Sequence, residues 1–395
     1  MSVGGAGYDV VIAGAGLAGL VAACELAQGG WRLLVVDARP AIDSRVHTTG
    51  IFVRRTFEDF ALPPDCLGPA IRRVVLHSPA GRRASLQSTL DEFRVADMGA
   101  LYRRLLTRAR QAGVEYQPST RYVASRAFDG GSTIELESRG EAHQVRTRLI
   151  IGADGATSRV ARDLGLDENR EWIVGVEDVL AGSLHPGEPE LHCIVDPQLA
   201  PGYIAWVADD GEAVHVGVGG RPDRFQPAAA LASLYSRLFA DPCFARLQGL
   251  RRTERRGGRI PVNGLLGRIG CARGVLIGDA AGAVSPLTAG GLDPCYRLTR
   301  RATSMVAKVL EGAPAELLDA YSGAPYRRHF ARKRRGRRML ERLWHPLLVE
   351  LAFAALRTPP GRRLARRVLF GRGSFPDIDP PTSAMTDTIR AAVAG

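Results

Sequence analysis

The sequence lacks the patterns that mark a secreted, metal-binding or membrane-spanning protein. Its six cysteines are scattered, with no C-x-x-C pair and no metal-ligand spacing, so we expect a reduced, cytoplasmic protein without a metal site. We find no basic segment followed by an apolar run and a cleavage site, and so expect no secretory signal. No apolar run approaches the roughly 20 residues that span a bilayer. The best candidate, residues 346–356, is short and contains Glu350.

Several catalytic motifs are also missing. The chain contains no G-x-S-x-G, no H-E-x-x-H and no Walker P-loop, which argues against a serine hydrolase, a zinc protease and a P-loop nucleotide hydrolase. Lysine is nearly absent, since Lys308 and Lys333 are the only two in 395 residues. The chemistry is therefore expected to come from a bound cofactor, with the protein supplying position and electrostatics.

Positive charge is concentrated near the C-terminus. The formal net charge is +12, but residues 326–372 alone carry 15 Lys and Arg against Glu341 and Glu350, which leaves the rest about neutral. Three uses of this segment remain open: contact of the Arg-rich and then apolar residues 327–356 with an anionic membrane surface, attraction of a diphosphate-bearing substrate, or a basic helix packed on the body of the protein. We expect no nucleic-acid partner, because no nucleic-acid-binding module accompanies the charge.

The N-terminal segment carries a dinucleotide-binding fingerprint. A buried strand, residues 8–13, runs into Gly14-Ala-Gly-Leu-Ala-Gly19, then a helix over residues 20–27 and a second strand, 32–37, which ends in an acid. In such a unit the glycines allow a tight turn, close approach of a pyrophosphate and packing of the helix on the sheet. The helix start presents free N–H groups to the phosphates. The predicted contacts are Gly14, Gly16, Leu17, Ala18 and Gly19, with Asp37 and Ala38 at the ribose.

Two more acids follow predicted strands. Asp154 follows the predicted strand 148–152 and precedes a glycine and a helix, and Asp279 follows the apolar run 274–277. Beyond Asp279 the chain has only small residues, a Pro-Leu-Thr turn and a Gly-Gly pair, in the sequence Gly278-Asp-Ala-Ala-Gly to Gly290-Gly-Leu292. Ligands of open α/β sheets collect at such strand ends.

Together these motifs resemble the FAD-dependent oxidoreductases of the para-hydroxybenzoate hydroxylase type. Within that group, the segment 278–291 is most similar to the geranylgeranyl reductase family. Pro201-Gly-Tyr-Ile-Ala-Trp206, the strand 214–219 and the segment 369–377 resemble stretches of the same family. The resemblance covers most of the chain.

The resemblance implies FAD as the cofactor and assigns further residues to it. Asp279, with Gly278 beside it, would bond the ribityl or pyrophosphate side, while Gly290, Gly291 and Leu292 would meet the flavin edge after Pro286. Asp154 would position the pyrophosphate region, and Arg103 falls where relatives carry a cofactor-contacting arginine.

Two departures from the family pattern stand out. Relatives often have a Cys-Gly-Gly segment where this chain reads Arg45-Val-His-Thr-Thr-Gly50, so Arg45 and His47 lie near the expected flavin. Asp293 adds a carboxylate beside the flavin edge, where it would either oppose an anionic reduced flavin or cap the following helix.

The implied fold is α/β. A Rossmann-like FAD-binding domain of the glutathione-reductase type is interleaved with a mostly antiparallel β-sheet substrate domain and followed by a helical C-terminus. The expected ranges are 1–172 and 263–325 for FAD binding, 173–262 for the substrate, and 326–395 for the basic helices. Part of 40–96 is expected to contribute to the substrate side.

The substrate side is expected to enclose a lipophilic molecule with aromatic side chains. Trp206 is the leading candidate, with Tyr203 and Trp172 as further ones, and His47 is the candidate proton donor. Because only one complete fingerprint exists, electrons are expected from NAD(P)H that docks transiently or from a separate reductase protein.

Three readings of the activity remain. The leading one is reduction of C=C bonds of a prenyl or isoprenoid-type group by hydride from reduced flavin. The alternative is a flavin monooxygenase that hydroxylates or epoxidises a lipophilic substrate through a C4a-hydroperoxide; a halogenase is weaker, because the W-x-W-x-I-P motif and a convincing lysine are missing. A non-catalytic, membrane-peripheral flavin carrier is the third reading.

Overall fold

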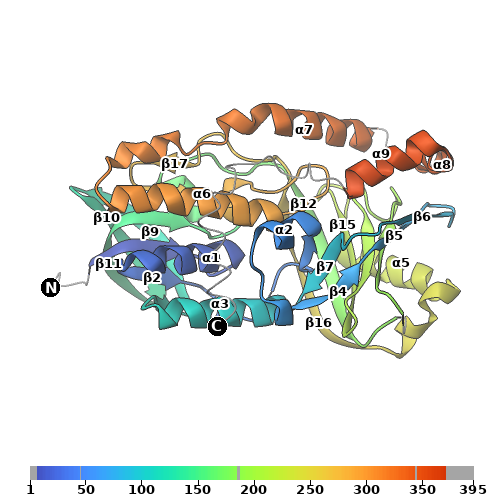
Figure 1. Cartoon of the computed structure of the whole chain (residues 1–395), viewed down its shortest axis with the longest axis horizontal. Helices are drawn as coiled ribbons and strands as arrows, with labels where there is room; N and C mark the ends of the chain where they lie inside the picture. Colours follow the sequence, from blue (N-terminus) through green and yellow to red (C-terminus); the bar gives the residue numbers. More distant parts are fainter. Residues whose placement is uncertain (1–6, 45, 185–186, 343–344, 371–395) are drawn as a thin grey trace.

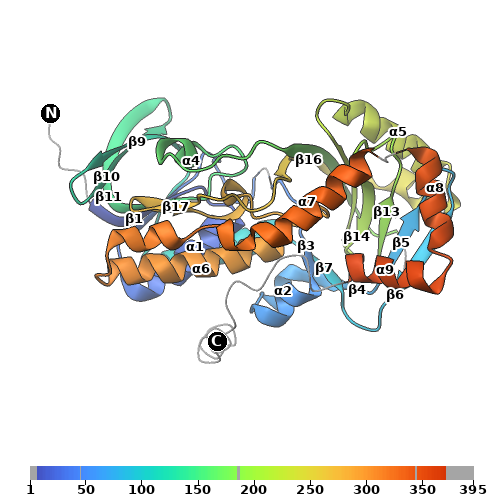
Figure 2. The same cartoon turned by 90° about the horizontal axis from the view of Figure 1, so that it is seen from above.

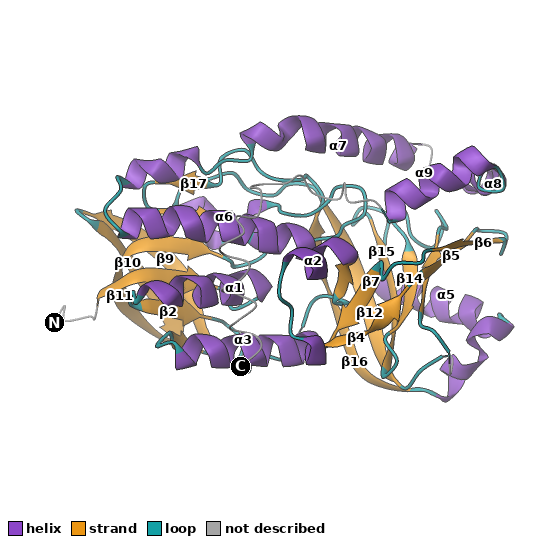
Figure 3. Cartoon of the chain, in the orientation of Figure 1, coloured by secondary structure: helices purple, strands orange, loops and turns teal. Residues whose placement is uncertain are grey.

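The structure is a computed structural model that describes residues 7–44, 46–184, 187–342 and 345–370. Two large sheets lie side by side, and helices cover one end of the molecule and part of the other (Figure 1). Figure 3 shows the long helices gathered over the first sheet and the strands of the second sheet standing beside them. This arrangement confirms the predicted fold class.

The first sheet is the nucleotide-binding type. Its path is β17 (Gly270–Cys271), β18 (Gly274–Leu276), β11 (Glu141–Gly152), β1 (Gly7–Ala13), β2 (Leu33–Val36) and β8 (Glu115–Gln117). From β18 to β8 neighbouring strands pair in parallel. An antiparallel meander extends this sheet: β10 (Gly131–Ser138) pairs with β11, and β9 (Thr120–Phe128) pairs with β10.

Helix α1 (Leu17–Leu26) packs against both α3 (Met98–Gln111) and α6 (Leu292–Leu310) beside this sheet. Strand β2 is buried at all four residues, and β1 is buried over its last four. Continuous apolar, β-branched strands of this kind are favoured where a parallel sheet is covered on both faces. The carboxyl ends of β1, β2, β11 and β18 therefore meet at one edge, next to the predicted ligand segments.

The second sheet has seven strands. In order they are β16 (Arg251–Pro261), β12 (Trp172–Ala181), β15 (Ala213–Gly220), β14 (Ala205–Asp209), β13 (Glu190–Ile194), β5 (Arg73–His77) and β6 (Arg83–Gln87). All neighbours are antiparallel except β13 and β5. Helix α5 (Pro227–Phe239) buries Leu231, Leu234 and Leu238 against one face, the spacing that places apolar side chains on one side of a helix.

Smaller elements connect the two sheets. A three-stranded sheet joins β3 (Ile51–Val53), β7 (Phe93–Ala96) and β4 (Leu67–Ile71), with α2 (Arg54–Asp59) following β3. Helix α4 (Arg159–Asp163) follows β11.

Three helices end the described chain: α7 (Arg327–Arg342), α8 (Pro346–Ala355) and α9 (Pro359–Leu369). Figure 2 shows α7 running from beside α6 toward the second sheet, with α8 and α9 beyond it. Arg337 of α7 donates to the carbonyl oxygens of Pro286 and Gly202, both at 3.1 Å, and so ties the two halves together. No helix within the described ranges has the length and apolar character that crossing a bilayer would need.

Candidate active site

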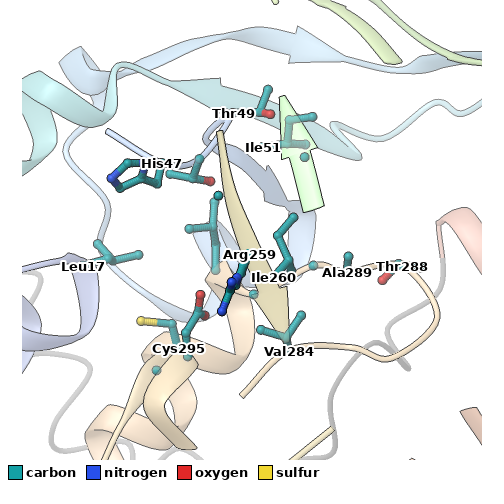
Figure 4. A pocket seen from close by; sticks show the side chains of 18 of the residues that line it. Leu17, His47, Thr49, Ile51, Arg259, Ile260, Val284, Thr288, Ala289 and Cys295 are labelled. Carbon is teal, nitrogen blue, oxygen red and sulfur yellow. The ribbon is translucent and has the colours of Figure 1, made fainter. Parts of the chain in front are cut away.

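One cavity of about 1190 Å³ runs from the carboxyl ends of the parallel strands to the inner face of the second sheet. This volume exceeds the roughly 300–1,000 Å³ of ordinary ligand pockets, so a cofactor and a second ligand fit together. Figure 4 shows Leu17, His47 and Cys295 on one side of it and Ile260, Val284 and Ala289 on the other, with Arg259 between them. The predicted cofactor residues that line the cavity are Gly14, Gly16, Leu17, Ala18, Asp37, Ala38, Asp154, Gly278, Asp279, Gly290, Gly291 and Leu292.

The glycine fingerprint has the geometry that a phosphate site needs. Gly14 has a φ of +102°, and a Cβ there would lie 2.3 Å from the carbonyl oxygen of Ala153. A Cβ on Gly19 would lie 1.9 Å from the carbonyl oxygen of Gly14, so only glycine lets α1 pack this closely. A Cβ on Gly16, in contrast, would meet nothing within 4 Å. The open space at Gly16, beside the N-terminus of α1, fits a pyrophosphate.

Asp37 is already engaged within the chain. Its carboxylate accepts from the backbone N–H of Ala15 at 2.7 Å and from Nε of Arg39 at 2.8 Å. Arg39 also donates to the carbonyl oxygen of Ala15 at 2.9 Å. Asp37 and Arg39 therefore hold the fingerprint loop, and contact between Asp37 and a ribose remains a prediction. Arg39, which also lines the cavity, was missed by the sequence reasoning.

Asp279 differs, because its carboxylate has no hydrogen-bond or ion-pair partner among the described residues. It follows β18 and lines the cavity, and burial raises its pKa to about 6. Asn169 fixes its backbone by donating to the carbonyl oxygens of Asp279 and Ala156, at 2.8 and 3.0 Å. Even a half-buried carboxylate is costly to leave without a partner, so a ligand that brings hydroxyl groups would satisfy it. The ribityl chain of FAD fits this requirement.

Asp154 stabilises its own turn. It accepts from Oγ of Ser158 at 2.6 Å and from the backbone N–H groups of Arg159 and Val160 at 2.7 and 3.2 Å. Burial raises its pKa, and these donors favour its charged form. Its carboxylate thus shapes the cavity wall at the start of α4.

The Gly-Gly pair begins α6 at the cavity. Gly291 is the N-terminal cap of this 19-residue helix, with no side-chain cap hydrogen bond, so N–H groups of the first turn remain for a ligand. The hydroxyl of Tyr203 donates to the carbonyl oxygen of Thr288 at 3.0 Å. The second half of the molecule therefore supports the loop that leads into α6.

Asp293 was expected either beside the flavin edge or as the cap of the following helix, and both expectations are wrong. It neither caps α6 nor lines the cavity; its buried carboxylate pairs with Arg297 at 2.9 Å and accepts from Oγ1 of Thr56 at 3.2 Å. Arg297 also pairs with Asp59 at 2.6 Å. The charge of Asp293 is therefore neutralised inside the protein.

Several other predicted residues lie elsewhere. Gly19 and Pro286 are outside the cavity lining, although both belong to segments that form it. Arg103 is also outside it, exposed and paired with Asp43 at 2.6 Å, so its contact with a cofactor stays a prediction. Arg45 lies outside the described residues, as does most of the 369–377 stretch.

Trp206 forms part of the wall on the second sheet. Its indole N–H donates to Oε2 of Glu177 at 2.7 Å, and its ring meets Tyr203 edge-on with centroids 6.3 Å apart. A Cβ on Gly217 of the neighbouring strand would lie 2.2 Å from the ring, so a glycine is required beneath it. Because its only donor is occupied, Trp206 presents an apolar face rather than a proton. Trp172 lies outside this cavity, beneath Arg259 at 5.9 Å.

Glu177 is the centre of a charged cluster that the sequence reasoning missed. It lines the cavity and is 4% exposed. Besides the Trp206 indole, it accepts from the hydroxyl of Thr49 and from Nε of Arg256 at 2.8 Å. Burial alone would raise the pKa of Glu177, but the hydrogen bond from His215 and the charge of Arg256 outweigh it and lower the pKa to about 2.

His215 extends this cluster toward Asp210. Its Nε2 lies 3.0 Å from Oδ2 of Asp210 and its Nδ1 lies 3.4 Å from Oε1 of Glu177. Burial would lower the pKa of His215, but hydrogen bonds to Asp210 and Glu177 outweigh it and raise the pKa to about 9. One sequence signal existed for the cluster: Glu177 is a charged residue within the apolar run of β12.

His47, the predicted proton donor, lines the cavity and is exposed to it. Its Nδ1 lies 3.0 Å from the carbonyl oxygen of Gly257 and so donates to it. That bond fixes the ring at the β16 edge and leaves Nε2 as the nitrogen that a ligand in the cavity can meet.

Comparisons with known proteins agree with this geometry. Residues 7–208 match the FAD binding domain family. The digeranylgeranylglycerophospholipid reductase 1 of Methanopyrus kandleri is 32% identical over 77% of this chain and 81% of its own. The structure of a geranylgeranyl bacteriochlorophyll reductase-like protein from Thermoplasma acidophilum superposes with a TM-score of 0.79, at 18% identity, over 93% of this chain and 97% of its own. The p-nitrophenol 4-monooxygenase of Pseudomonas putida has a TM-score of 0.64, at 18% identity, over 98% and 96% of the two chains.

Proposed function

Because the chain belongs to the geranylgeranyl reductase family of FAD-dependent oxidoreductases, we propose that it saturates C=C bonds in the isoprenoid chains of a lipid. The observation that carries this proposal is one continuous cavity, which joins Asp279, whose carboxylate has no partner among the described residues, to an apolar chamber. Bound FAD, once reduced, supplies hydride to one carbon of the double bond, and a proton completes the other.

The chamber suits a hydrocarbon chain. Its wall includes the apolar side chains of Leu76, Phe93, Leu191, Ile204, Leu356 and Phe370. These come from the second sheet, the small sheet and the C-terminal helices, so the chamber is closed by segments far apart in sequence. Burial of apolar surface is worth about 25 cal/mol per Å², which favours a long prenyl chain over a small polar substrate.

We assign proton delivery to His47. It lines the cavity beside β16, and its Nδ1–H bond to Gly257 orients Nε2. In the imidazolium form, the Nε2–H proton goes to the second carbon of the double bond, and solvent, to which the side chain is exposed, returns a proton to Nε2. Glu177 is an unsuitable donor, because its partners hold it as a carboxylate. On this basis His47→Ala lowers kcat, while FAD retention stays at the wild-type level; an unchanged kcat rules out this role.

The reductant is proposed to be NAD(P)H that docks transiently, or a separate reductase protein. The glycines at 217, 219 and 220 belong to β15, a strand inside the antiparallel sheet, with no following helix of the fingerprint type. Stopped-flow mixing of the oxidised holoprotein with NADPH distinguishes the two reductants. Rapid bleaching of the flavin absorbance shows that NADPH reduces it directly, whereas no bleaching points to a separate reductase protein.

Anaerobic single-turnover experiments test the proposed reaction. The holoprotein is reduced with dithionite, and a prenyl lipid or oxygen is then added in separate mixing experiments. We expect the lipid to reoxidise the flavin without oxygen and to gain two hydrogens by mass spectrometry. If the flavin reoxidises only with oxygen and the product gains an oxygen atom, the proposal is overturned in favour of a monooxygenase. The p-nitrophenol 4-monooxygenase shows that the same fold is found in such an enzyme. No turnover under either condition supports a flavin carrier.

A further inference from the structure

The outer face of α8 and α9 is the main exposed apolar surface of the described chain. Among the described residues, eight large hydrophobic side chains are exposed, and five of them lie on this pair of helices: Leu347, Leu348, Leu351, Leu364 and Val368. Leu347, Leu351 and Leu364 are each about two-thirds exposed, at 68%, 66% and 65%. The other three, Leu90, Phe128 and Phe239, lie on separate elements. Clustered exposed leucines of this kind mark an interaction site.

The inner face of the same helices forms the wall of the cavity. Ala352 and Leu356 at the end of α8, and Ala365 and Leu369 on α9, line it. Val368 is both 45% exposed and part of the lining. The two helices are therefore the layer that separates the apolar chamber from the outside, and Val368 stands at its rim.

Positive charge accompanies this face. Residues 357–367 carry five arginines and no acid: Arg357, Arg362, Arg363, Arg366 and Arg367. All five are exposed, and none pairs with a carboxylate within the part of the chain that the structure describes. Glu350, the one acid of α8, accepts from the backbone N–H of Ala80 at 2.8 Å and pairs with Arg82 at 3.5 Å.

Helix α7 is less suited to contact with a membrane than α8 and α9. The membrane contact that the sequence predicted for residues 327–356 therefore moves toward the α8–α9 face. Arg334 and Arg338 pair with Glu171 at 2.8 and 3.4 Å. Arg337 is buried between the two halves of the molecule and pairs with Glu341 at 2.8 Å. These arginines of α7 hold the helix on the body of the protein.

We propose that the leucines and arginines of the α8–α9 face dock the protein on an anionic phospholipid bilayer, so that a lipid chain passes from the bilayer past Val368 into the cavity. Apolar side chains flanked by arginines match the two layers of such a surface, acyl boundary and headgroups. The docking itself does not require the proposed reaction, whereas the passage of a substrate chain rests on it.

Vesicle co-sedimentation tests the docking. The purified holoprotein is mixed with sucrose-loaded vesicles of phosphatidylcholine alone or of phosphatidylcholine with phosphatidylglycerol. We expect binding to the anionic vesicles that weakens with added salt, and a loss on the order of a hundredfold in the Leu347→Ser/Leu351→Ser/Leu364→Ser variant. The matched control, Leu90→Ser/Phe239→Ser, removes exposed apolar side chains elsewhere and is expected to bind like wild type.

Any of three outcomes overturns the proposal, two of them in vesicle binding and the third in self-association. The first two are wild-type protein that does not bind anionic vesicles, and a triple variant that binds them as well as the control does. The third is a leucine-dependent dimer in sedimentation equilibrium without lipid, which makes the face a self-association surface. Unchanged melting temperature and FAD content in the triple variant show that it is folded.

A second arm separates docking from catalysis. The triple variant is expected to retain activity toward a short, detergent-dispersed prenyl substrate and to lose it toward a lipid embedded in vesicles. Equal activity of variant and wild type on the embedded lipid refutes the entry route. Leucine-dependent vesicle binding without reductase activity on either substrate leaves the docking in place and removes the proposed function.

Discussion

Replacement of Glu177 by glutamine removes the charge that holds one wall of the cavity. Partners within the chain lower the pKa of this carboxyl from its ordinary value near 4.5 to about 2. A shift of that size corresponds to about 3 kcal/mol, because one pKa unit is worth about 1.36 kcal/mol. Breaking a buried ion pair from one side is known to cost about 3–5 kcal/mol. We therefore expect Glu177→Gln to lower the free energy of unfolding by about 3 kcal/mol.

The assay is urea unfolding at neutral pH, monitored by near-ultraviolet circular dichroism. Glu254→Gln is the matched control, since Glu254 pairs with the same Arg256 at 3.6 Å but is 40% exposed in its side chain. An exposed pair contributes about 0–1 kcal/mol, so the control is expected to unfold close to wild type. Glu177→Gln protein as stable as Glu254→Gln protein would refute the reasoning.

The same carboxylate predicts how stability changes with pH. Because the pKa of Glu177 is lower in the folded protein than in the unfolded chain, its contribution is complete above pH 4.5 and is lost as pH falls toward 2. The difference in unfolding free energy between wild type and Glu177→Gln should therefore shrink as pH is lowered through this range. A difference that stays constant or grows contradicts the assignment.

Two further sites yield predictions. Asp279→Ala is expected to weaken FAD retention, measured as flavin absorbance after gel filtration, and full retention argues against its role. FAD affinity of the wild type should fall as pH drops through about 6, because protonation removes the Asp279 carboxylate that accepts from ligand hydroxyls; fluorescence titration of Asp279→Asn should show no such dependence. Gly217→Ala places a Cβ 2.2 Å from the Trp206 ring and is expected to destabilise the protein by about 1–3 kcal/mol and raise KM, whereas Gly249→Ala, with nothing within 4 Å, should be neutral.

The nucleotide-binding half was predictable because its signals are local. Strand, glycine turn, helix, strand and acid follow one another within residues 8–37, and the structure forms β1, α1 and β2 there. The parallel pairing of β5 with β13 was not predictable. It joins segments more than a hundred residues apart, and strand periodicity says which face is buried but not which strand is the neighbour.

The error at Asp293 had a signal that was overlooked. Asp293 and Arg297 are four residues apart in a predicted helix, the spacing at which opposite charges on a helix meet. Its proximity to the Gly-Gly pair in sequence suggested a place beside the flavin. In the structure the side chain turns toward α2, where Thr56 and Asp59 complete the cluster.

Asp279 and Glu177 have different roles that the local sequence could not distinguish. Both are acids on or directly after apolar strands, and both line the same cavity. Their pKa values are moved in opposite directions, to about 6 and about 2, because His215 and Arg256 come to Glu177 from other strands while no side chain of the described residues bonds to Asp279. A carboxylate whose hydrogen bonds are supplied by the chain belongs to the wall of a site. One that lacks them, as Asp279 does among the described residues, is predicted to be completed by a ligand, and that difference lies in distant partners that the neighbouring sequence does not contain.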